Sequence, residues 1–223
     1  MVNKPSKSIQ EYLKQIYKLN QAGGTASTTD LAARLNVAPA SVTGMLQRMA
    51  SVKPALVIYK KHQGVTLTET GERQALEIIR HHRLLETYLV SSLGYSWDEV
   101  HEEACRLEHD ISENFESRIA QALGNPSRDP HGDLIPTPEL TMPAENILPL
   151  AALRVDETAT VKRVSADDPA LLRYLGQIGL VPETMVSIKD YSTFDGNLTV
   201  QVEGQSSQVV LGTAVTSQVF VEK

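Results

Sequence analysis

Four residues whose side chains bind transition metals lie close together near the middle of the chain: His101, Cys105, Glu108 and His109. If this segment is helical, about 100° per residue places the four side chains within one arc of about 100°. Imidazole, thiolate and carboxylate donors on one helical stripe suit a divalent transition metal of intermediate softness. The spacing therefore predicts a metal site on one face of a helix.

A second pair of the same kind, His82 and Glu86, lies upstream with a spacing of four residues. Taken singly, such residues have ordinary structural roles, because a lone histidine is commonly solvated or packed and Cys105 alone would be a small buried hydrophobe. Together they favour a bound ligand, since a neutral core would hardly collect so many polar groups without a partner. The alternative is a catalytic pair of Cys105 and His109, but a nucleophile inside a helix lacks an oxyanion hole. We therefore expect a binding protein and not an enzyme.

The charge of the chain is distributed unevenly. Residues 1–73 carry 10 Lys and Arg against 4 Asp and Glu, a net charge of +6, and the remaining residues carry 11 against 23, a net charge of −12. A basic first third on an acidic body is typical of a nucleic-acid-binding domain joined to a regulatory body, although a solvated basic face would give the same count. The single cysteine excludes an intramolecular disulfide, and no apolar run approaches the ~20 residues that span a bilayer. These features predict a cytoplasmic protein.

Hydrophobic spacing and turn residues indicate a winged helix-turn-helix in residues 1–73. Helices are predicted over 8–20, 30–35 and 39–49, followed by a β-hairpin over 56–68. In this motif the last of the three helices enters the major groove and the hairpin approaches phosphates, unless the domain serves only protein contacts. The residues predicted to face DNA are Thr29, Ala38, Pro39, Ala40, Ser41, Thr43, Gly44, Gln47, Arg48, Lys60 and Lys61.

The remaining residues are predicted to form a second helical domain and a small β-barrel, so the fold class is mainly α with small β. Helices are expected over 74–93, 96–109 and 111–123, within a metal-binding and dimerisation domain of residues 74–140. A linker over 141–152 leads to a barrel over 153–223, with five short strands and one helix. The helices carry more aliphatic side chains than a lone three-helix unit needs, which predicts a homodimer.

The chain resembles the diphtheria-toxin-repressor family of metal-dependent transcription regulators, which includes the iron and the manganese repressors. The resemblance covers essentially the whole chain. The segments that carry it are similar to the family's first helix at 11–17, its ligand pair at 82–86, its signature helix at 101–109, the end of its dimerisation domain at 129–136 and the FeoA-like barrel of its longer members at 153–222.

The resemblance implies two metal sites per subunit, for Mn(II) or Fe(II). The primary site would take Glu11, Cys105, Glu108 and His109. The ancillary site would take His82, Glu86 and His101, and Asp167 or Asp168 of the barrel is a candidate for a further ligand. The iron repressors hold a methionine at the position of Glu11. A carboxylate there favours Mn(II), whereas the thiolate of Cys105 favours Fe(II) or softer ions.

We therefore expect a homodimeric regulator that metal activates to bind double-stranded palindromic operator DNA, most simply as a repressor of metal-uptake genes. A metal that bridges Glu11 to the dimerisation helix would fix the angle between the two domains and hold two recognition helices about 34 Å apart. A winged-helix regulator with an organic effector and a structural histidine cluster is the main alternative. Sensitivity of DNA binding to a chelator distinguishes the two.

Overall fold

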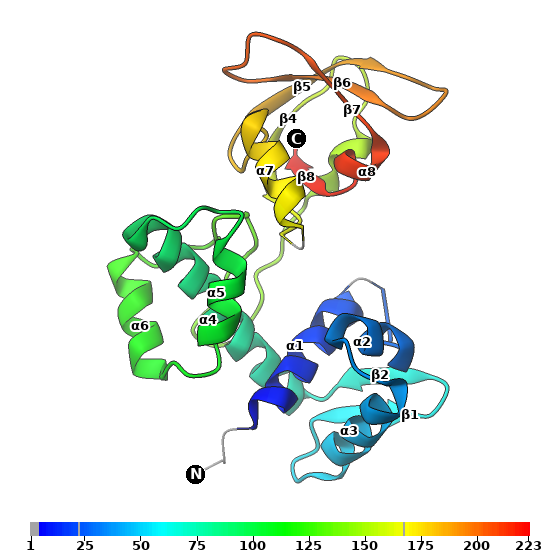
Figure 1. Cartoon of the computed structure of the whole chain (residues 1–223), viewed down its shortest axis with the longest axis vertical. Helices are drawn as coiled ribbons and strands as arrows, with labels where there is room; N and C mark the ends of the chain where they lie inside the picture. The colour runs from blue at the N-terminus through cyan, green and yellow to red at the C-terminus, as the bar shows by residue number, and fades with distance from the viewer. Residues whose placement is uncertain (1–4, 22, 167) are drawn as a thin grey trace. The chain divides into compact units, whose positions relative to one another are not determined.

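The protein consists of two compact units, shown in the computed structural model of Figure 1, which describes residues 5–21, 23–166 and 168–223. The first unit comprises Met1–His82, Glu108–Ile111 and Pro136–Met142. The second unit comprises Arg83–Leu107, Ser112–Ile135 and Pro143–Lys223. Each unit has its own hydrophobic core. No helix in the described part of the chain is long and apolar enough to cross a membrane.

The first unit is a winged helix-turn-helix, as predicted. Its elements are α1 (Lys7–Gln21), α2 (Thr28–Leu35), α3 (Pro39–Ser51), β1 (Val57–Lys60) and β2 (Gly64–Leu67), coloured blue to cyan in Figure 1. The hydroxyl of Ser27 caps α2 by accepting a hydrogen bond from the amide of Asp30, and Asn36 ends that helix in the left-handed region. Pro39 begins α3, where its missing amide hydrogen costs nothing.

The core of the first unit lies between α1 and the helix-turn-helix. Leu13, Ile16, Leu31, Leu46 and Met49 are fully buried there, and each contributes about 1.5–3 kcal/mol by leaving water. These residues recur at helical spacing, so the same pattern that predicts the helices also predicts their inner faces.

The long helix α4 (Glu69–Leu93) begins in the first unit and continues into the second. The hydroxyl of Thr68 caps this helix by accepting a hydrogen bond from the amide of Gly71. Gly71 is required at this position, because a Cβ atom there would lie 1.9 Å from the carbonyl oxygen of Leu56. Close packing of the helix start against the backbone of Leu56, just before β1, therefore selects glycine.

The helical part of the second unit contains α5 (Val100–Leu107) and α6 (Glu113–Ala122). The prediction of one helix over 96–109 is wrong at both ends, since α5 begins only at Val100 and ends before Glu108. Residues Glu108–Ile111 belong to the first unit, where the carbonyl oxygen of Glu108 accepts a hydrogen bond from Nδ1 of His81 at 3.0 Å. Tertiary contacts at this turn thus override the helical pattern.

The C-terminal part of the second unit is an antiparallel sheet of six short strands. In spatial order the strands are β3 (Leu148–Pro149), β8 (Val219–Glu222), β4 (Thr158–Val164), β5 (Met185–Tyr191), β6 (Leu198–Val202) and β7 (Val209–Leu211). The predicted barrel is not closed, because the end strands β3 and β7 do not pair with each other among the described residues. Strands of two and three residues are too short for the tilt and stagger that closure requires.

Three short helices belong to the same sheet domain: η1 (Leu150–Ala152), α7 (Pro169–Gln177) and α8 (Thr213–Thr216). Leu172 and Leu175 of α7 pack in the core with the inward-facing side chains of the sheet. β3 and η1 come from residues that the sequence assigns to the linker. Part of the predicted linker is therefore ordered within the sheet domain.

Candidate metal centres and DNA-binding surface

The first unit brings together Glu11, Glu108 and His109, which we call the first cluster. Glu11 lies on α1, and the other two lie in the turn after α5. One donor atom of each lies within 4.8 Å of the others, and Nε2 of His109 is 3.2 Å from Oε1 of Glu108 and 3.7 Å from Oε2 of Glu11. Glu108 is fully buried, whereas the side chain of Glu11 is 32% exposed. Two carboxylates and an imidazole form a donor set that fits Mn(II) or Fe(II).

Further polar side chains surround the first cluster, and sequence reasoning missed two that lie on the buried face of α1, Gln10 and Lys14. Nζ of Lys14 lies 2.5 Å from Oε1 of Glu108 and 3.1 Å from Oε2 of Glu11. Nδ1 of His109 donates to the side-chain oxygen of Gln10 at 2.9 Å, which leaves Nε2 facing the carboxylates. Gln10 and Lys14 are four residues apart on the buried face of α1. Polar residues on an otherwise apolar helical face were the signal that could have identified them.

The surroundings hold both carboxylates of the first cluster in the ionised state. Burial by itself would raise the pKa of Glu11, but hydrogen bonds from His109, Gln15 and Lys14, with the charge of Lys14, lower it to about 2. Burial acts in the same direction on Glu108, where the opposing contacts of His82 and Lys14 prevail and lower its pKa. Ionised carboxylates are the form that coordinates metal, so the first cluster is prepared for a cation at neutral pH.

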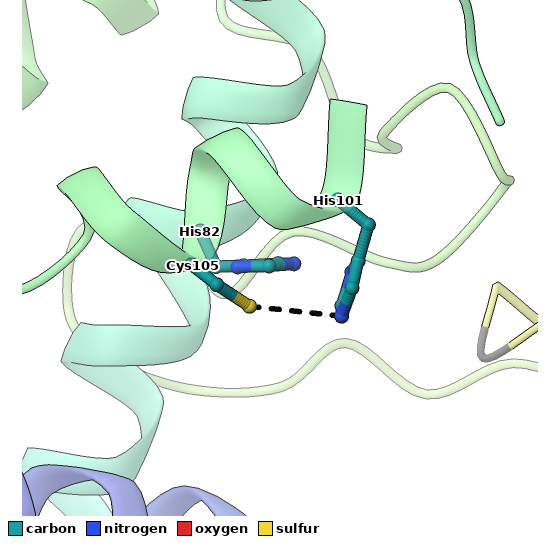
Figure 2. A group of neighbouring side chains, drawn as sticks. All are labelled: His82, His101 and Cys105. Carbon is teal, nitrogen blue, oxygen red and sulfur yellow. Dashed lines mark hydrogen bonds between the residues drawn. The ribbon is translucent and has the colours of Figure 1, made fainter. Parts of the chain in front are cut away.

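The remaining predicted ligands belong to both units, His82 to the first and Glu86, His101 and Cys105 to the second. His82, predicted for the ancillary site, has Nδ1 2.6 Å from Oε2 of Glu108 in the first unit. Cys105 lies in the second unit on α5, and Figure 2 shows its sulfur next to His101, 3.6 Å from Nε2. The assignment of Cys105 to the primary site stays a prediction, because its predicted partners belong to the other unit. His101 also has Nδ1 3.1 Å from Oε1 of Glu86, so these two predicted ancillary ligands do meet.

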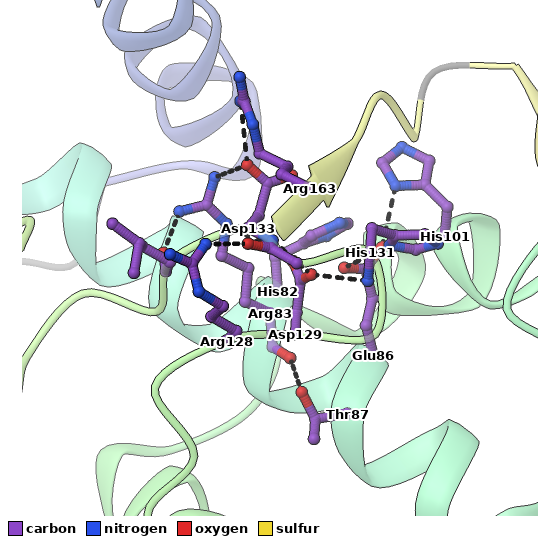
Figure 3. Close-up of polar contacts among 12 residues, drawn as sticks. His82, Arg83, Glu86, Thr87, His101, Arg128, Asp129, His131, Asp133 and Arg163 are labelled. Atoms are coloured by element: carbon purple, nitrogen blue, oxygen red, sulfur yellow. Dashed lines mark hydrogen bonds and ion pairs between the residues drawn. The ribbon is translucent and has the colours of Figure 1, made fainter. Parts of the chain in front are cut away.

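A second cluster lies within the second unit and consists of Glu86, Asp129 and His131, all buried (Figure 3). Nδ1 of His131 is 3.7 Å from Oε2 of Glu86, while Nε2 donates to the carbonyl oxygen of Trp97 at 2.6 Å. The sequence did not predict Asp129 and His131 as ligands, although both lie in the segment 129–136 that carries part of the family resemblance. Their distance from Glu86 along the chain concealed the contact.

The electrostatics of the second cluster differ from those of the first. Burial and the nearby carboxylates of Asp133 and Glu86 raise the pKa of Asp129 to about 7, against the opposing charges of Arg83 and His131. Burial lowers the pKa of His131, but its contacts with Glu86, the charge of Asp129 and the Trp97 carbonyl outweigh burial and raise it. Excess negative charge in a buried site is relieved by protons or by a bound cation.

Neither residue of the sheet domain that the sequence offers as a further ligand is confirmed as one. Asp167 lies outside the described residues. Asp168 caps α7, where its carboxylate accepts a hydrogen bond from the amide of Ala170 at 2.8 Å. Its role as an additional ligand stays a prediction, and the capping interaction accounts for the aspartate at this position.

The surface predicted to face DNA is available to solvent. Of its residues, only Thr43 is half-buried, and its hydroxyl donates to the carbonyl oxygen of Pro39 at 3.2 Å. The exposed ones are Thr29, Ala38, Pro39, Ala40, Ser41, Gly44, Gln47, Arg48, Lys60 and Lys61. A Cβ atom on Gly44 would meet nothing within 4 Å, so no contact inside the protein explains glycine there. Close approach of DNA to α3 would explain it.

A winged helix-turn-helix joined to buried clusters of metal-binding side chains defines a metal-dependent DNA-binding regulator. The chain belongs to the family of iron-dependent repressors. Residues 4–65 match the family's N-terminal DNA-binding domain, residues 68–137 its metal-binding and dimerisation domain, and residues 148–223 a FeoA domain. The protein is therefore a transcription regulator and not an enzyme, and its domains serve DNA binding and dimerisation.

Relatives and solved structures agree with this assignment. The chain is 32% identical to the iron-dependent repressor IdeR of Mycobacterium tuberculosis, over 95% of each chain. It is 35% identical to the diphtheria toxin repressor of Corynebacterium diphtheriae over 56% of this chain and 54% of that protein. A solved manganese-dependent transcriptional repressor in complex with manganese is 38% identical, with a TM-score of 0.88 over 96% of this chain and 98% of that one.

Proposed function

We propose that the protein represses metal-uptake genes when Mn(II) or Fe(II) binds it, and that it does so in the cytoplasm as a homodimer on a palindromic operator. The observation that carries this proposal is the first cluster. Glu11 comes from the first helix of the DNA-binding domain, whereas Glu108 and His109 follow a helix of the dimerisation domain. A single ion bound there ties the two functional parts of the chain together.

The proposed mechanism is a linkage between metal binding and domain geometry. Metal can shift the equilibrium between domain arrangements only by its preference for the one that binds operator. Coordination by Glu11, Glu108 and His109 provides that preference, because it requires α1 and the turn after α5 to be held together. Two recognition helices held about 34 Å apart then match successive turns of the DNA major groove.

We propose a second metal site centred on Glu86, which gives two ions per subunit. Its Oε1 faces His101 at 3.1 Å and its Oε2 faces His131 at 3.7 Å. The buried carboxylate of Asp129 belongs to the same group as Glu86 and His131, which with His101 gives four candidate ligand residues in all. Equilibrium dialysis with Mn(II) should give two bound ions for the wild type and one for Glu86→Gln.

The oxygen donors of Glu11 and Glu108 favour Mn(II), and the thiolate of Cys105, if it joins them, favours Fe(II). Titration of operator binding with each metal under anaerobic conditions, followed by fluorescence anisotropy, tests activation and ranks the two metals. We expect tight binding with metal and weak binding in EDTA. Equal affinity in both conditions would instead support a regulator with an organic effector.

A further inference from the structure

Lys14 is a buried lysine inside the first cluster. Its side chain is only 4% exposed, and lysine is almost never so buried unless it is paired. Its ammonium group contacts two carboxylates from distant parts of the chain, Glu108 at 2.5 Å and Glu11 at 3.1 Å. Lys7, on the same helix, shows the contrast: its ion pair with Asp110 at 2.6 Å has both side chains about 60% exposed.

The oxygen atoms that Lys14 contacts are the ones that face the histidine of the cluster. Oε1 of Glu108 is 3.2 Å from Nε2 of His109, and Oε2 of Glu11 is 3.7 Å from the same nitrogen. The ammonium group of Lys14 therefore contacts two of the three donor atoms that would hold a metal. A divalent ion bound about 2.1 Å from an oxygen that is 2.5 Å from the ammonium nitrogen lies within about 5 Å of that nitrogen, where like charges repel.

We propose that Lys14 is a built-in cation that holds the first cluster together in the metal-free protein and that the activating metal ion must displace. The proposal rests on the proposed metal site at Glu11, Glu108 and His109. Metal activation is then an exchange of one cation for another, and the displacement of Lys14 sets the metal concentration at which the regulator responds.

The charges of the site explain why Lys14 stabilises the metal-free cluster and why a metal ion displaces it. Without metal, Glu11 and Glu108 would place two negative charges beside each other, and the ammonium group offsets one of them. With a divalent ion bound, the two carboxylates are already neutralised, and Lys14 adds an uncompensated positive charge. The lysine thus stabilises the metal-free cluster and opposes the metal-bound one.

If Lys14 had a different role, its loss would have the opposite effect on metal binding. If the lysine only positioned the carboxylates for metal, its loss would weaken metal binding along with the fold. The exchange proposal predicts that loss of Lys14 lowers the stability of the metal-free protein and tightens metal binding. The two effects have opposite signs, so one pair of measurements separates the two roles.

The test compares Lys14→Met with wild type in the full-length protein, with Lys7→Met as the matched control on the same helix. Competition with a chelating dye measures the Mn(II) dissociation constant, and urea unfolding in EDTA measures the metal-free stability. We expect Lys14→Met to bind Mn(II) at least about tenfold more tightly and to unfold at a lower urea concentration in EDTA. Lys7→Met should match wild type in both measurements.

Unchanged or weaker Mn(II) binding by Lys14→Met would overturn the proposal. Should that variant fail to fold, Lys14→Gln retains a hydrogen-bond donor beside Glu108 without the charge, and the same tightening is expected. Glu108→Gln identifies the site under test. If Glu108→Gln loses Mn(II) binding while Lys14→Met binds Mn(II) as wild type does, the metal site stands and only the proposed role of Lys14 is rejected. If Glu108→Gln binds Mn(II) as wild type does, the proposed metal site itself is rejected.

Discussion

The two clusters contain similar donor groups, yet their surroundings prepare them for different states. In the first cluster the ammonium group of Lys14 lies directly on the carboxylates, and the pKa values of Glu11 and Glu108 are lowered. In the second cluster Nε of Arg83 stays 3.7 Å from Asp129, and the pKa of Asp129 rises to about 7. Burial and the charges and hydrogen bonds of neighbouring groups, more than the type of donor, decide whether the pKa of a buried carboxylate is lowered or raised.

The cation of the second cluster is engaged by other groups. Arg83 donates to the carboxylate of Asp133 at 3.2 Å and to the carbonyl oxygen of Leu134. Asp129 uses one oxygen to accept hydrogen bonds from the amides of His131 and Asp133, which organises its loop. The first cluster is thus partly open to solvent and ionised, as suits a sensor, whereas the second is closed and shaped by its own loop.

Replacing one glutamate in each cluster should show the difference between the two clusters most clearly. Glu108→Gln keeps the size of the side chain but removes a ligand charge, so operator affinity at micromolar Mn(II) should fall at least about 100-fold. Glu86→Gln should cost only about tenfold, because the second ion does not connect to α1. Fluorescence anisotropy on labelled operator measures both. Glu102→Gln, an exposed glutamate on α5, is the control, and equal losses in the two cluster variants would refute the distinction.

Metal choice should depend on the first cluster. Glu11→Met replaces a hard oxygen donor by a soft thioether, so the ratio of activation midpoints should move toward Fe(II) and away from Mn(II) by about tenfold. Anaerobic titration of operator binding with each metal gives the ratio. A ratio that does not move would mean that Glu11 is not a ligand, and the proposed link between α1 and the metal would lose its support.

The stability of the metal-free protein should respond to pH in opposite directions at the two clusters. The lowered pKa values of Glu11 and Glu108 stabilise the fold above pH 4.5, and this contribution is lost as the pH falls below 4.5, for Glu11 as it approaches about 2. The raised pKa of Asp129 means that stability falls as the pH rises from about 4 to about 7, and the raised pKa of His131 acts in the same direction.

Urea unfolding in EDTA across pH 2–8 measures this dependence. Asp129→Asn, which keeps an acceptor for both loop amides, should flatten the decrease toward neutral pH. Glu11→Gln should leave that decrease unchanged and reduce only the loss on the acid side. An Asp129→Asn profile that matches wild type would show that the second cluster does not store protons.

The smallest expected effect tests whether the DNA surface acts independently of both clusters. Lys60→Ala and Lys61→Ala should each reduce the slope of log affinity against log salt by at most about 0.9, because each lysine can neutralise one phosphate. The Mn(II) dissociation constant should stay at the wild-type value. An unchanged slope would remove the wing from the DNA interface, and a changed metal affinity would show that the surface and the first cluster are coupled.

Local patterns in the sequence suffice for much of this protein. Helical spacing predicts α1, α2 and α3 with their buried faces, and alternation with turn residues predicts most strands of the β domain. The donor chemistry of Glu11, Glu108 and His109 is also a property of residue types, and their place in one cluster follows from the family resemblance.

Only the tertiary structure decided which side chains meet across long stretches of chain. Lys14 and Glu108 are 94 residues apart, and Asp129 and His131 reach Glu86 through a loop whose course no local period records. Against the local pattern, α5 also ends before Glu108, and the end strands of the sheet do not pair with each other among the described residues. Periodicity reports which face of an element is buried, but the identity of its partner across the fold depends on the packing of whole elements. That packing placed a lysine in one cluster and a fully buried aspartate beside other carboxylates in the other.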